Sequence, residues 1–154
     1  MKNKLLIVLS LLIISVGAQA KLAGKNVVLV HGLNPLDILE RPAESLLQAR
    51  ADNYWEEYWL AKADANLYWS GAERITGGIK DDMQDQFQAL AASGTCQAGC
   101  VFVTHSTGDL VLRYALSKLG QWGISSNQVK VLAVLDFAGA GGGTELADIA
   151  VSVS

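Results

Sequence analysis

The chain has 154 residues, of which 51% are hydrophobic and 18% are charged, and its formal net charge is −3 at pH 7. A chain of this length can bury one modest hydrophobic core, and no repeat or low-complexity linker indicates a second domain. Its Lys and Arg residues form no cluster after the first twenty positions, which argues against a nucleic-acid partner.

The first twenty residues have the three parts of a secretory signal peptide. Two lysines precede an apolar segment from Leu5 to Val16, and Ala18-Gln19-Ala20 supplies a small-x-small cleavage site. The apolar segment is shorter than the ~20 residues that a membrane-spanning helix needs, so we expect cleavage after Ala20 rather than an uncleaved anchor. The mature chain, residues 21–154, would then be periplasmic or secreted and would carry 10 basic and 15 acidic residues, a net charge of −5.

Four stretches have the composition of β-strands. The first, Lys25–Gly32, is a run of β-branched residues that ends in glycine, which is typical of a strand buried on both faces. The other three candidates are Ala65–Gly71, Cys100–Ser106 and Val129–Gly139.

Helical periodicity separates these strands. The predicted helices are Pro42–Ala63, Ile79–Ser93 and Asp109–Gly120, and Gly120 is a natural residue to end the third of them. Strands that alternate with helices predict an α/β fold whose parallel sheet is covered on both faces. The apolar residues at helical spacing are Leu46, Leu47, Tyr54, Tyr58 and Trp59 in the first helix, Ile79, Met83, Phe87 and Leu90 in the second, and Leu112, Ala115, Leu116 and Leu119 in the third.

Two cysteines, Cys96 and Cys100, stand close together just before the third strand. In an exported protein such an even pair indicates a disulfide. A metal half-site is the alternative, but it would need two further ligands, and the only two histidines belong to other motifs.

A serine marks the turn between the third strand and the third helix, in the sequence Thr104-His105-Ser106-Thr107-Gly108. A hydroxyl at this corner would lie above the carboxyl edge of the sheet, where α/β proteins bind ligands. The free N–H groups and positive dipole end of the helix would also face it, and such groups stabilise an oxyanion. Ser106 could instead merely cap the helix. The pattern is G-x-S-x-G with Thr104 in place of the first glycine, and the first strand ends in "VHGL", which matches the HG element of esterases and lipases.

Three stretches, "VVLVHGL", "VTHSTGDLVLRY" and "FAGAGGGTELAD", resemble the secreted bacterial lipases of the α/β-hydrolase superfamily. The resemblance implies a serine ester hydrolase such as a triacylglycerol lipase, with Ser106 as nucleophile and the backbone N–H groups of Leu33 and Thr107 as oxyanion donors. It implies an ester or lipid substrate and transient contact with a lipid interface. The sequence itself carries no cofactor motif, and no metal site can be built from its residues. Asp148 falls on a position that is not the catalytic acid. Whether the substrate is a triglyceride, a phospholipid or a simple ester stays open, as does a peptidase or acyltransferase activity on the same fold.

Four polar positions need separate interpretation. Asp136 ends the fourth strand, where some lipases carry the triad acid, although the resemblance puts that acid beyond Ser154; a strand-end turn residue is the alternative. Asp109 stands where a second glycine is common, and it would bring negative charge near a developing oxyanion. We expect His31 to be buried and hydrogen-bonded, and His105 to point away from Ser106 in a packing role.

The aromatic stretch Asn53–Trp59, with Tyr68 and Trp69, could line an acyl groove or belong to the core.

No histidine follows Ser106, although this fold normally orders its triad as Ser, then Asp or Glu, then His. We expect the sequence to be the amino-terminal part of a longer hydrolase domain, with residues 21–154 supplying about four strands and an exposed apolar edge. The alternatives are a catalytically inactive hydrolase-like binding protein and a base supplied by another subunit.

Overall fold

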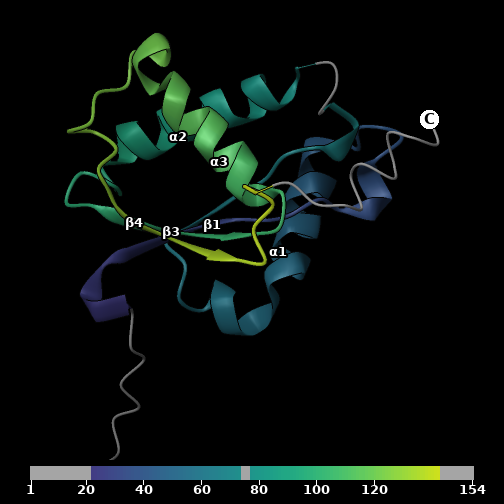
Figure 1. Ribbon diagram of the computed structural model, residues 1–154, viewed down its shortest axis with the longest axis horizontal. Coiled ribbons are helices and arrows are strands. Elements are labelled where there is room, and N and C mark those ends of the chain that lie inside the picture. Colours follow the sequence, from purple (N-terminus) through teal and green to yellow (C-terminus); the bar gives the residue numbers. More distant parts are fainter. Residues whose placement is uncertain (1–21, 74–76, 143–154) are drawn as a thin grey trace, which may run out of the picture.

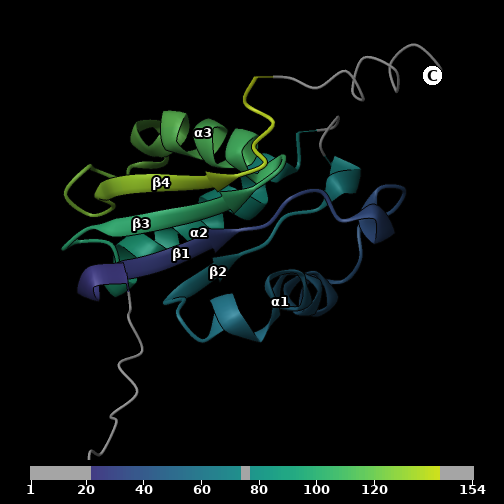
Figure 2. The ribbon, with the colours of Figure 1, turned by 60° about the horizontal axis from the view of Figure 1, so that its bottom comes forward.

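The computed structural model describes residues 22–73 and 77–142. Within them, four parallel strands form one sheet in the order β2-β1-β3-β4 (Figures 1 and 2). The strands are β1 (Asn26–Val30), β2 (Ala65–Leu67), β3 (Cys100–His105) and β4 (Val131–Phe137). The expected signal peptide and Asp148 lie outside the described residues.

Three α-helices connect the strands: α1 (Glu44–Leu60), α2 (Ile79–Ser93) and α3 (Gly108–Lys118). Figure 1 shows α2 and α3 on one face of the sheet and α1 on the other. Alternate residues of the central strands supply the two cores, because successive side chains of a strand point to opposite faces. Val28, Val30 and Phe102 pack with α2 and α3, whereas Val27, Leu29 and Val103 pack with Trp55 of α1. This arrangement confirms the predicted α/β class.

The strand order fixes where the sheet offers a ligand site. From β1 the chain moves outward to β2, returns to β3 on the other side of β1, and continues to β4. The direction of winding therefore reverses between β1 and β3. In open parallel sheets the crevice at the carboxyl ends of two such strands is the usual place for a ligand.

The fourth strand departs from the expectation of a sheet covered on both faces. It is an edge strand, and Val131, Leu132, Val134, Leu135 and Phe137 are each between 36% and 47% exposed. Along β1, by contrast, Val27 to Val30 are fully buried. Within the described residues, β4 is thus the exposed apolar edge that the sequence led us to expect.

Three details of the helices differ from the prediction. The left-handed residue that ends the third helical segment is Gly123, with φ 74°, because a short 3-10 turn over Leu119–Trp122 extends α3 past Gly120. Glu56, with φ 56° and ψ 172°, breaks the regular geometry inside α1. Leu46 and Tyr58 were expected on the apolar stripe of α1 but are 45% and 65% exposed, and the buried positions of this helix are Leu47, Ala51 and Trp55.

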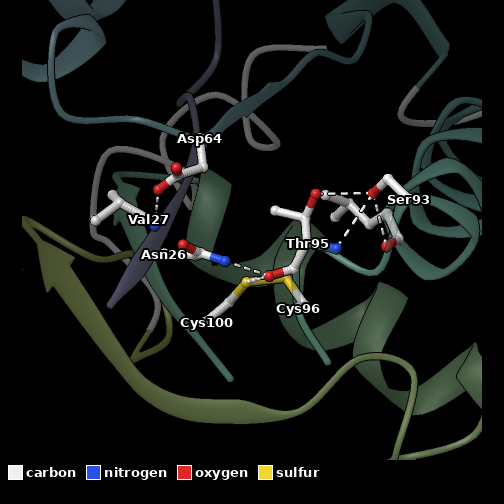
Figure 3. Close-up of a disulfide and its surroundings, with 8 residues drawn as sticks. Asn26, Val27, Asp64, Ser93, Thr95, Cys96 and Cys100 are labelled. Carbon is white, nitrogen blue, oxygen red and sulfur yellow. Dashed lines mark hydrogen bonds between the residues drawn. A yellow bond between two sulfur atoms is a disulfide. The ribbon is translucent and has the colours of Figure 1, made fainter. Parts of the chain in front are cut away.

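The predicted disulfide is present. Cys96 and Cys100 are joined with an S–S distance of 2.01 Å, and both are fully buried. Figure 3 shows the bridge between the turn that follows α2 and the first residue of β3, with Asn26 of β1 hydrogen-bonded to the Thr95 carbonyl oxygen beside it. The bridge therefore fixes the start of β3 against the end of α2. Among the described residues, no helix is long and apolar enough to cross a membrane.

Candidate functional site

Ser106 occupies a tight turn between β3 and α3. Its φ is 55°, in the left-handed region that L residues rarely adopt and that costs about 1 kcal/mol or more. The backbone N–H of Ser106 donates to the Phe137 carbonyl oxygen at 3.0 Å, and the Ser106 carbonyl oxygen accepts from the Ala140 N–H at 3.1 Å. The end of β4 and the residues after it therefore hold the serine in this strained conformation.

Two glycines allow the chain segments around Ser106 to approach closely. A Cβ atom on Gly32 would lie 2.9 Å from the Ser106 Cβ, and one on Gly108 would lie 2.5 Å from the His31 carbonyl oxygen. Separations this short are sterically forbidden, so neither position accepts a side chain without a backbone shift. The "HG" element after β1 and the glycine after the serine are thus needed for the same reason: the start of α3 presses against the end of β1.

An apolar pocket of about 430 Å³ opens beside this turn. Leu33 and Thr107, the expected oxyanion donors, both line it, together with Trp69, Val111 and Tyr114. Within residues 22–73 and 77–142, no backbone hydrogen bond occupies the Leu33 or Thr107 N–H. The Thr107 hydroxyl is also buried with no partner among these residues. The site therefore combines a serine, two available N–H donors and an apolar cavity large enough for a hydrocarbon chain.

Thr104 and Asp136 are brought together by the pairing of β3 with β4, in which they occupy the same register position. Thr104 is fully buried, and its hydroxyl donates to Asp136 Oδ1 at 2.8 Å. The threonine that replaces the usual glycine is thus accommodated by a hydrogen bond. Asp136, considered as a triad acid from the sequence, has this threonine as its partner, while the hydrogen bonds of His31 and His105 go to other groups.

Asp109, in the first turn of α3, is only 1% exposed. Arg113, one helical turn later, donates from Nε to Asp109 Oδ2 at 2.8 Å. This pairing offsets the negative charge of Asp109, which the sequence analysis expected near the proposed oxyanion donors. The arginine itself is largely exposed, so it reaches inward from the surface to meet a buried carboxylate.

His31 is 2% exposed and both of its ring nitrogens are occupied, as expected for a structural residue. Nδ1 lies 2.6 Å from the Gly32 carbonyl oxygen, and Nε2 accepts from the Trp69 N–H at 3.2 Å. The ring stacks on the Trp69 indole with centroids 5.4 Å apart. Desolvation by burial lowers the pKa of His31 to about 4, partly opposed by the hydrogen bond to Gly32. His31 is therefore neutral at pH 7, and its ring is not available to Ser106.

His105 lies on the α1 face and shares a hydrogen bond through Nδ1 with the Tyr54 hydroxyl. Sequence reasoning missed this role of Tyr54, and it also missed that Trp69 stacks on His31. The partners are 51 and 38 residues apart in the chain, so no local pattern could have revealed them. That Trp69 could line a groove was one of the two alternatives the sequence offered, and it does line the pocket. In the described residues, no group of three or more His, Cys, Asp or Glu side chains is arranged to hold a metal ion.

No family model matches the chain, and no curated protein or solved structure matches it either.

Proposed function

We propose that this protein is an exported serine carboxylic-ester hydrolase that acts through an acyl-enzyme on Ser106. The observation that carries the proposal is the strained turn at Ser106 beside an apolar pocket lined by Leu33 and Thr107. A capping serine has no need of a left-handed backbone, since N-cap residues normally adopt extended geometry. Strain that the surrounding structure maintains is instead characteristic of functional sites.

The proposed reaction has two steps. Ser106 Oγ attacks the carbonyl carbon of the ester while a base takes its proton, and the Leu33 and Thr107 N–H groups bind the resulting oxyanion. The carbon–oxygen bond to the alcohol then breaks, and the alcohol leaves with the proton. Water attacks the acyl-enzyme in the same way and releases the carboxylic acid. The apolar pocket would hold the acyl chain.

The proposal requires a base, and neither histidine of the sequence has a hydrogen bond to Ser106 among the described residues. Both histidines are hydrogen-bonded to other groups. We therefore assign proton removal to a histidine encoded beyond codon 154 or carried by a second chain. Reading the coding sequence past codon 154 tests the first possibility, because it should reveal an acidic residue followed by a histidine.

The activity itself is tested on the complete gene product with a fluorophosphonate probe and short-chain p-nitrophenyl esters. We expect labelling at Ser106 and turnover, both abolished in Ser106→Ala. Ser117→Ala is the matched control, because Ser117 is an exposed serine of α3, the helix that follows Ser106, and its hydroxyl donates to the Tyr114 carbonyl oxygen. The isolated 154-residue chain should retain at most the residual rate of about 10³ to 10⁴ over solution that an oxyanion hole gives without a base. Rapid Ser106-dependent turnover by that chain would show that His31 or His105 acts as base.

A catalytically inactive binding protein is the second candidate, favoured by the lack of any histidine after Ser106. The apolar pocket would then bind a lipid or fatty acid without cleaving it. The two functions separate on one comparison: a binding protein retains fatty-acid affinity in Ser106→Ala and reacts with no probe even as the complete gene product.

A further inference from the structure

A second concave surface lies on the α1 side of the sheet, separate from the pocket that Leu33 and Thr107 line. It encloses about 310 Å³, and the residues that line it are Tyr54, Trp55, Glu56, Trp59, His105 and Phe137. They come from the middle of α1 and from the last residues of β3 and β4, which are paired in the sheet. The proposed hydrolase function uses none of these side chains.

Five aromatic rings form a nearly continuous wall around this pocket. The centroid distances along the wall are 5.6 Å from His105 to Tyr54, 5.7 Å from Tyr54 to Trp55, 6.3 Å from Trp55 to Trp59 and 5.7 Å from Trp59 to Phe137. His105 and Phe137 occupy the same register position on adjacent strands, which closes the circuit. Successive rings are inclined by 57° to 72°, so they form a cup rather than a flat platform.

The chemistry of this cup suits a cation. The faces of aromatic rings carry partial negative charge, and two of the rings are indoles, which bind cations best. Among the described residues that line the pocket, the one with a formal charge is Glu56, and its charge is negative. We propose that the pocket binds a quaternary ammonium group, either of a small molecule such as choline or of a lipid headgroup.

Two further observations support a ligand here. Glu56 interrupts α1 between the two tryptophans with a left-handed φ of 56°, a steric cost of the kind that recurs at binding sites. Lys62 does not fill the pocket from within the chain, because its ammonium lies 3.5 Å over the ring of Tyr58, which is not a lining residue.

A sugar is the other ligand that aromatic side chains commonly hold, but the geometry disfavours it. Sugar rings stack on an open, flat aromatic face, whereas here neighbouring rings are inclined to one another by 57° and 72° around a volume of about 310 Å³. A compact, nearly spherical cation contacts several inclined faces at once. The inclination of the rings therefore favours an ammonium group over a sugar as the ligand.

The test measures binding alone, so its outcome is independent of ester hydrolysis. Calorimetric titration of the full chain with choline should give a dissociation constant on the order of 1 mM, a range in which weak cation–π sites are measurable. The uncharged isostere 3,3-dimethyl-1-butanol has the same shape and should bind at least about fivefold more weakly, since it lacks the charge that the rings attract. Vesicles of phosphatidylcholine compared with phosphatidylglycerol distinguish a lipid headgroup from a free small molecule.

Variants connect the binding to the pocket. Phe137→Leu and Trp59→Leu should each weaken choline binding by about threefold or more. Tyr58→Leu, which removes a neighbouring aromatic ring outside the pocket, should leave it unchanged. Glu56→Gln keeps the shape of the side chain and should weaken binding about twofold, with a smaller effect at high salt. The proposal is wrong if neither choline nor phosphatidylcholine binds, or if a simple glucoside binds instead. It is also wrong if the neutral isostere binds as well as choline, or if Glu56→Gln and Phe137→Leu both leave the affinity for choline unchanged.

Discussion

The buried imidazole of His31 should make the stability of this protein fall in mild acid. Its pKa is about 4 in the folded chain against 6.5 for a free histidine, so the unfolded state binds more protons between these values. Stability is then full above about pH 6.5 and decreases as the pH falls toward 4. A difference of about 2.5 pH units corresponds to about 3 kcal/mol, which is a large share of the 5–15 kcal/mol that stabilises a typical domain.

Urea unfolding between pH 4 and pH 8 measures this loss. His31→Asn removes the titrating group, so the variant should be less stable than the original protein at pH 7 but should lose about 3 kcal/mol less on acidification. The other titrating groups are common to both proteins and cancel in the comparison. Direct titration of the His31 ring by NMR gives a second reading, with an expected midpoint near 4. Equal pH dependence in the two proteins, or a His31 midpoint near 6.5, would refute the assignment of His31 as a buried neutral residue.

Three stability predictions follow from the same region and from the disulfide. Ser106→Gly should be more stable than Ser106→Ala by about 1 kcal/mol, because only glycine adopts a φ of 55° without strain; equal urea midpoints would show that the turn is not strained. Gly108→Ala should lower the free energy of unfolding by roughly 2 kcal/mol or more, because its Cβ would lie 2.5 Å from the His31 carbonyl oxygen. Gly120→Ala is the control: no atom lies within 4 Å of its Cβ, so the free energy of unfolding should change by less than about 1 kcal/mol. Reduction of the disulfide should lower the free energy of unfolding by only about 2 kcal/mol, since the bridge closes a very short loop. Peptide mapping under non-reducing conditions should find the two cysteines linked to each other. Free thiols would contradict this.

Much of the fold could be predicted because its signals are local. Each predicted strand contains the observed one, from the apolar run at β1 to the β-branched residues of β4. The start of α3 was predicted to within one residue from the small residues that follow Ser106. The kink of α1 was not predicted, because Glu56 carries no sequence signal for a left-handed backbone, and its cost is offset by packing that the sequence does not display.

Part of the candidate site could likewise be predicted from the sequence, and part could not. The sequence alone predicted Ser106, Leu33 and Thr107 as candidate site residues, because the motifs that suggest such a site are short and are set by the sterics of a tight turn. It also predicted the disulfide, because two cysteines close together after a signal-peptide pattern are usually paired, and the structure contains this bridge. Only the tertiary structure decided that Thr104 holds Asp136, that Trp69 and Gly32 occupy both nitrogens of His31, and that α1 brings its aromatic residues to the ends of β3 and β4. Most of these contacts join residues more than thirty positions apart, and which of them form depends on the order of the strands in the sheet.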